Sequence, residues 1–254
     1  MTKRKKFVLV SSILTFGLIG LQFIPLDRRY EAIIFFSGVS VLLSLWSLYS
    51  DLKGINWLTA MILPALYPAS VGLFYFLLPV NIFSRTVLLS LFGIGMYALL
   101  LTENIYAVAA SRTIQLVRAA HAVGFLLTVI TAVFLIGTLF GLRLSYLANG
   151  IMVMVILWPL FIKGLWSSTI QKNISGTIWM YSAVLALVGG EIAMFTAFLP
   201  MTSLVAAILV SGYLYVTLGL MQQHLQERLF SKTIQEYVWV GIIVFLAALL
   251  VTYR

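Results

Sequence analysis

One acidic residue lies well inside a long apolar stretch of this chain. Glu191 falls in the segment 178–199, about 13 residues from its start, which corresponds to ~20 Å along a helix. A carboxylate in membrane hydrocarbon is costly unless it is protonated, hydrogen-bonded or hydrated. We therefore predict that Glu191 binds a proton or a cation. The alternative is a protonated acid that donates one hydrogen bond to another helix.

Small residues mark the other side of the same segment. Gly189, Ala193 and Ala197 recur every four residues, and in a helix their stripe lies about 160° around the axis from Glu191. Such a stripe allows another helix to approach closely. The sequence thus predicts a helix that is packed on both sides, at the centre of a bundle.

A second polar cluster joins the apolar segments 86–108 and 119–141. Its members are Glu103, Asn104, Arg112, Gln115, Arg118 and His121. If helix continues through this region, the last three polar residues recur every three positions and share one side. Arginine donors beside a histidine that titrates near neutral pH make these residues candidates for binding an anionic headgroup or a partner. The favoured interpretation is an ordinary basic connection in which Glu103 is neutralised by Arg112 or Arg118.

Residues for other chemistry are scarce. The chain has no Cys and only two His, so thiolate sites and a clustered zinc motif are excluded. No Gly-x-Ser-x-Gly elbow and no Asp-rich motif is present. We therefore expect no metal and no cofactor. An enzyme that modifies lipids is accordingly the least favoured functional hypothesis, after the two that are given below.

Serines form a regular line in the segment 32–50. The line consists of Ser37, Ser40, Ser44 and Ser47, with spacings of three, four and three residues. Small hydroxyl residues at heptad spacing favour close helix packing. A hydrophilic track that ends at Asp51 is the alternative.

Two prolines interrupt the segment 57–79. Pro64 and Pro68 are one helical turn apart, so each removes an amide donor and frees a backbone carbonyl one turn earlier. We predict a kink that serves packing. Cation binding by the freed carbonyls is the alternative, because such carbonyls are tolerated in a membrane only beside protein or water.

The charges fall between long apolar segments, and this pattern predicts an all-α, polytopic transmembrane helix bundle. Hydrophobic residues make up 62% of the chain and charged residues 9%, against about 25% charged in a soluble domain. We predict one transmembrane domain over residues 1–254 without a soluble domain. About nine spans are expected, or eight if the third or the last does not cross: 7–25, 32–50, 57–79, 86–108, 119–141, 145–163, 178–199, 202–221 and 237–253.

Basic residues orient these spans, because positively charged connections stay in the cytoplasm. With a cytoplasmic N-terminus, the inner side holds Lys3, Arg4, Lys5, Lys6, Lys53, Arg112, Arg118, Lys163, Lys172, Arg228 and Lys232, eleven of the sixteen. The net charge of +9 is dispersed over short connections, which indicates anionic lipids rather than nucleic acid as the partner. A protein partner or a homo-oligomer is a further expectation.

The stretch from Leu101 to Ala110, with Arg118-Ala119-Ala120-His121 after it, resembles uncharacterised bacterial multi-spanning membrane proteins of unknown function. The resemblance implies a bacterial cell membrane, with the inner membrane as the compartment, and carries no activity with it. The leading hypothesis is a small transporter or permease that uses Glu191. The alternative is a non-catalytic structural or assembly subunit of a membrane complex.

Overall fold

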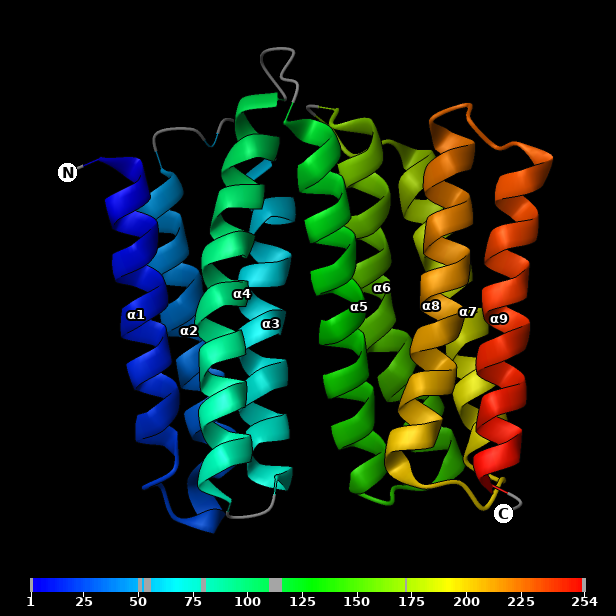
Figure 1. Ribbon diagram of the computed structural model, residues 1–254, viewed down its shortest axis with the longest axis horizontal. Coiled ribbons are helices and arrows are strands. Elements are labelled where there is room, and N and C mark those ends of the chain that lie inside the picture. Colours follow the sequence, from blue (N-terminus) through cyan, green and yellow to red (C-terminus); the bar gives the residue numbers. More distant parts are fainter. Residues whose placement is uncertain are drawn as a thin grey trace. The chain divides into compact units, whose positions relative to one another are not determined.

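The computed structural model describes residues 2–49, 52, 56–78, 81–109, 116–171 and 173–252. Within these residues the chain is helical and contains no strand, as Figure 1 shows. The α-helices are α1 (Lys3–Leu21), α2 (Arg29–Leu48), α3 (Asn56–Leu77), α4 (Ile82–Ala109), α5 (Val117–Gly141), α6 (Tyr146–Thr169), α7 (Gly176–Thr196), α8 (Ser203–Leu225) and α9 (Ser231–Thr252), with a 3-10 helix at Leu26–Arg28 before α2.

Each predicted span corresponds to one helix. In the described part of the chain, the eight helices from α2 to α9 are long and apolar enough to cross a membrane. The helix that falls short is α1, neither the third nor the last, because four basic residues occupy its first turn. The largest differences in length are in α4, α6 and α9, each five residues longer than its predicted span. The helix α6 continues to Thr169, six residues beyond the predicted end, and α9 begins at Ser231, six residues before the predicted start.

The starts of three helices have a common local cause. The side chains of Ser145, Ser175 and Thr202 accept hydrogen bonds from backbone amides in the first turns of α6, α7 and α8. Such N-caps satisfy amides that have no partner within the helix. Short polar turns therefore set where these membrane-spanning helices begin.

The chain divides into two compact units, Met1–Thr131 and Ala132–Arg254. The division falls within α5, so α1 to α4 and the first part of α5 belong to the first unit. The remainder of α5 and the helices α6 to α9 belong to the second unit. In the first unit, α2 packs on α3 and α1 packs on α4; in the second, α6 packs on α7 and α9 packs on α8.

The serine line of α2 lies against the proline region of α3 in the first unit. Pro68 has no N–H, so the carbonyl of Pro64 lacks its usual helical donor. The Ser40 hydroxyl donates a hydrogen bond of 2.8 Å to that carbonyl, and the Ser37 hydroxyl donates one of 2.8 Å to the carbonyl of Ala65. A carbonyl freed by the proline is thus satisfied from the neighbouring helix. This contact supports the packing interpretation of the serines over the hydrophilic track.

The two remaining serines of the line are also buried. The Ser47 hydroxyl donates to the carbonyl of Ser44 in its own helix, at 2.9 Å. The hydroxyl oxygen of Ser44 is buried without a hydrogen-bond partner among the described residues. The line therefore contains both interhelical bonds and bonds within α2.

We expect Ser40→Ala to lower the free energy of unfolding by about 1 kcal/mol, because it leaves the buried carbonyl of Pro64 without a donor. Ser47→Ala is the matched control, since Ser47 is equally buried but bonds only within its own helix. Unfolding in SDS, followed by tryptophan fluorescence, measures both variants. Equal losses in the two variants would show that the bond to α3 adds no stability.

Candidate functional site

A buried acid lies near the end of α4. Glu103 has no exposed surface and comes six residues before the end of the helix at Ala109, about 9 Å along the axis. Its neighbour Thr102 and, one turn further on, Tyr106 are buried on the same broad side of α4. The sequence placed Glu103 in the polar cluster that joins the segments 86–108 and 119–141. The structure instead encloses it.

Tyr106 connects α4 to α5 beside this acid. Its hydroxyl donates a hydrogen bond of 3.0 Å to the carbonyl of Ala120, and its ring centroid lies 5.6 Å from that of His121. A Cβ atom on Gly124 would lie 2.8 Å from the Tyr106 hydroxyl oxygen. The absence of a side chain at Gly124 therefore lets the phenol reach the backbone of α5, next to the half-buried imidazole.

The other described members of this cluster differ in exposure. Arg118 is exposed, whereas Asn104 is half-buried and its Oδ1 atom is buried without a hydrogen-bond partner among the described residues. Arg112 and Gln115 lie outside the described residues. Among the described members, Glu103 is thus buried and Arg118 is exposed. In the described part of the chain, no group of three or more His, Asp or Glu could hold a metal ion.

A buried cation in α6 is the site residue that sequence reasoning missed. Lys163 is only 1% exposed, and its ammonium nitrogen lies 5.0 Å from the centroid of the Trp166 ring. From the sequence alone, the charge of Lys163 predicts the end of a span at this residue. The available signal was the apolar pair Leu165-Trp166 after it, because the cluster of turn-forming residues begins only at Ser167, near the end of α6 at Thr169.

The turn that follows Lys163 is tied to α8. The carbonyl of Gly164 accepts a hydrogen bond from the Gln222 side chain at 2.9 Å and another from Ser167 at 2.7 Å. Leu218 of α8 fills the space that a Cβ atom on Gly164 would occupy. These contacts fix the turn of α6 next to the lysine. An enclosed cation in a membrane helix is by default a candidate functional group.

Glu191 lies on an exposed face of α7. The small stripe is on the other side: Gly189 and Ala193 are buried, and Ala197 is half-buried. A Cβ atom on Gly189 would overlap Leu157 of α6. The expectation of a helix packed on both sides is therefore not met, because α7 packs on α6 and α8 with one side and leaves the Glu191 side open.

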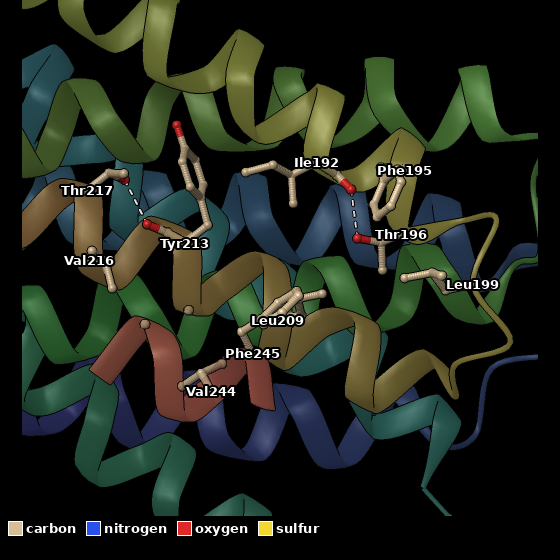
Figure 2. Close-up of a pocket in the computed structure, with 12 residues that line it drawn as sticks. Ile192, Phe195, Thr196, Leu199, Leu209, Tyr213, Val216, Thr217, Val244 and Phe245 are labelled. Atoms are coloured by element: carbon tan, nitrogen blue, oxygen red, sulfur yellow. Dashed lines mark hydrogen bonds between the residues drawn. The ribbon is translucent and has the colours of Figure 1, made fainter. Parts of the chain in front are cut away.

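An apolar groove of about 390 Å³ lies among α7, α8 and α9. Figure 2 shows its walls, in which the hydroxyls of Thr196 and Thr217 donate to the carbonyls of Ile192 and Tyr213. The Tyr213 hydroxyl donates to the carbonyl of Leu185 at 2.9 Å. These polar groups are satisfied by backbone, so methyl groups and rings face the groove. Its chemistry suits a hydrocarbon chain rather than a polar substrate.

A family model described as "Protein of unknown function (DUF5656)" matches residues 40–251. The match runs from within α2 to the end of α9 and includes Glu103, Lys163 and Glu191. No curated protein and no solved structure matches the chain significantly.

Proposed function

Because the chain belongs to the DUF5656 family, whose function is unknown, we propose a function from its own residues: it is a small proton- or cation-coupled membrane transporter. Glu103 is the coupling group. The observation that carries this proposal is the complete burial of Glu103 within a membrane-spanning helix. Ionisable residues inside membrane helices are expensive and mark ion pathways and proton relays.

The surroundings of Glu103 support this role. Tyr106 and His121 lie in ring contact one turn from the acid, toward the end of α4. A phenol can donate and accept a hydrogen bond, and an imidazole gains or loses a proton near neutral pH. These two groups therefore provide a polar route between the enclosed carboxyl and the helix end. Loss or gain of a charge at Glu103 is the event that would drive a change of conformation.

The exposed position of Glu191 makes it the weaker candidate for coupling. A coupling carboxyl must be reached from the aqueous phases through the protein, and Glu191 is on an outward side of α7. We assign it to helix association instead. The buried Lys163 is a second charged group for the transport cycle, in the other unit.

The membrane placement is part of the same proposal. The N-terminus is cytoplasmic and the compartment is the cell membrane, since the basic residues of the first turn of α1 and the exposed Arg118 favour a cytoplasmic side rich in anionic lipid headgroups. Anionic headgroups are therefore the proposed partners of these basic residues.

Transport by the purified protein in liposomes tests the proposal. Vesicles with a trapped pH-sensitive dye receive either an inward H⁺ gradient, or an inward gradient of Na⁺ or K⁺ with and without an opposing pH gradient. We expect dye responses above those of protein-free vesicles for at least one gradient. Responses equal to those of protein-free vesicles under all gradients would overturn the transport function.

Assembly into a membrane complex is the second candidate function. It is favoured by the exposed apolar side of α7, which carries the carboxyl group of Glu191. The two functions are compatible, because Glu103 and Glu191 lie in different units and on different helices.

A further inference from the structure

One side of α7 presents large apolar residues around a single acid. Met180, Val184, Leu187 and Phe195 are all exposed, and Glu191 is exposed between the last two. Their spacings of four, three, four and four residues keep them on one side of the helix. The order resembles the seam of a coiled coil, in which one polar position sets the register. We name these five residues the α7 seam.

The depth of Glu191 requires a polar partner for this seam. The residue is five positions before the end of α7 at Thr196, which is about 7.5 Å inside the helix end. A carboxyl at this depth that faces only lipid has no hydrogen-bonding group to replace water. A second surface that presents a donor or acceptor at the same depth would supply such a group to the seam.

We propose that the surface is the α7 seam of a second copy of this chain. Both copies insert with the same topology, so a twofold axis between them runs along the membrane normal. Residues next to such an axis meet their own counterparts. A second copy therefore brings a carboxyl to the depth of Glu191 by symmetry, which a different protein would do only if its own polar residue happened to match.

The chemistry of the pair is self-complementary. One protonated Glu191 carboxyl donates its O–H to a carboxylate oxygen of the other copy, or two protonated carboxyls each donate to the other. The doubly protonated pair is satisfied reciprocally, and the singly ionised pair is joined by one charge-assisted hydrogen bond. The large side chains above and below the pair supply van der Waals packing, which drives helix association in lipid.

Cysteine cross-linking tests the geometry directly, because the chain contains no native Cys. Single variants Val184→Cys and Leu187→Cys are reconstituted in liposomes at low protein density and oxidised. We expect disulfide-linked dimers from both. The controls are Ala183→Cys, which is exposed on α7 but off the seam, and Leu250→Cys, which is 73% exposed on α9. Equal cross-linking at control and seam positions would overturn the proposal.

Counting subunits tests the role of the acid. Single-molecule photobleaching in liposomes, over a range of protein-to-lipid ratios, gives the dimer fraction. We expect Glu191→Leu to weaken dimerisation about 3- to 30-fold, the usual range for interhelical hydrogen bonds in membranes. Glu191→Gln should retain the dimer, since paired amides donate and accept. Single bleaching steps for the wild type at every density, as for a monomer or a subunit of another complex, would overturn the proposal. The transport test at Glu103 does not depend on this result.

Discussion

Glu103→Gln is expected to reduce coupled ion flux to the rate of protein-free liposomes. Glutamine keeps the volume of the side chain and its ability to hydrogen-bond, but it cannot take up or release a proton and cannot carry a negative charge. Because Glu103 is fully enclosed in α4, no water or lipid headgroup can substitute for the missing charge. The initial rate of the dye response in proteoliposomes measures the effect.

Glu191→Gln is the matched control for this experiment. It makes the same chemical change on the exposed side of α7 and preserves the proposed dimer contact. We expect its flux to equal that of the wild type. Wild-type flux in Glu103→Gln, with equal amounts of folded protein in the vesicles, would remove Glu103 as the coupling group. Loss of flux in Glu191→Gln with retention in Glu103→Gln would transfer that role to α7.

Gly190→Val is expected to separate α6 from α7 and to lower the free energy of unfolding by about 3 kcal/mol, which is about 100-fold in the ratio of folded to unfolded protein. A Cβ atom on Gly190 would lie 2.8 Å from the carbonyl oxygen of Gly150, and one on Gly150 would lie 2.9 Å from that of Gly190. The backbones of α6 and α7 are therefore in direct contact at Gly150 and Gly190. No side chain can rotate away to relieve the overlap.

Gly38→Val controls for the effect of valine itself. Gly38 lies within α2, and nothing approaches within 4 Å of the position of its missing Cβ atom. Both variants gain the same helix propensity, so the difference between them reports packing. SDS titration followed by tryptophan fluorescence measures the two. A loss in Gly190→Val no larger than in Gly38→Val would show that α6 and α7 need no close contact.

The contact between the serines of α2 and the prolines of α3 shows which features the sequence predicts and which it does not. The spacing of Ser37 to Ser47 indicated packing, and Pro64 and Pro68 indicated freed carbonyls, but these features lie in separate segments. Neither segment by itself predicts that the serines and the prolines contact each other. The hydrogen bond from Ser40 to the carbonyl of Pro64 joins the two, and it depends on how α2 and α3 pack.

Lys163 shows a limit of predicting membrane spans from hydropathy. A charge in a hydropathy pattern signals the end of a membrane span, because an isolated lysine in hydrocarbon is costly. The rule fails where the protein encloses the charge, as α6 does with Lys163 next to the ring of Trp166. Trp166 is only three residues away, but α6 is also covered by α7 and α8, which are distant in sequence and which no local window contains.

The sequence by itself determined the number of helices in the described chain, nearly all of their ends and their membrane character. These properties are local, since a fixed rise per residue and a fixed hydrocarbon thickness translate directly into apolar run length. Only the tertiary structure decided which acid is enclosed. Glu103 and Glu191 both lie in apolar helices, yet the first is buried and the second is exposed. The rotation of a helix depends on the helices that pack against it, and an all-round apolar segment contains little information about its own rotation.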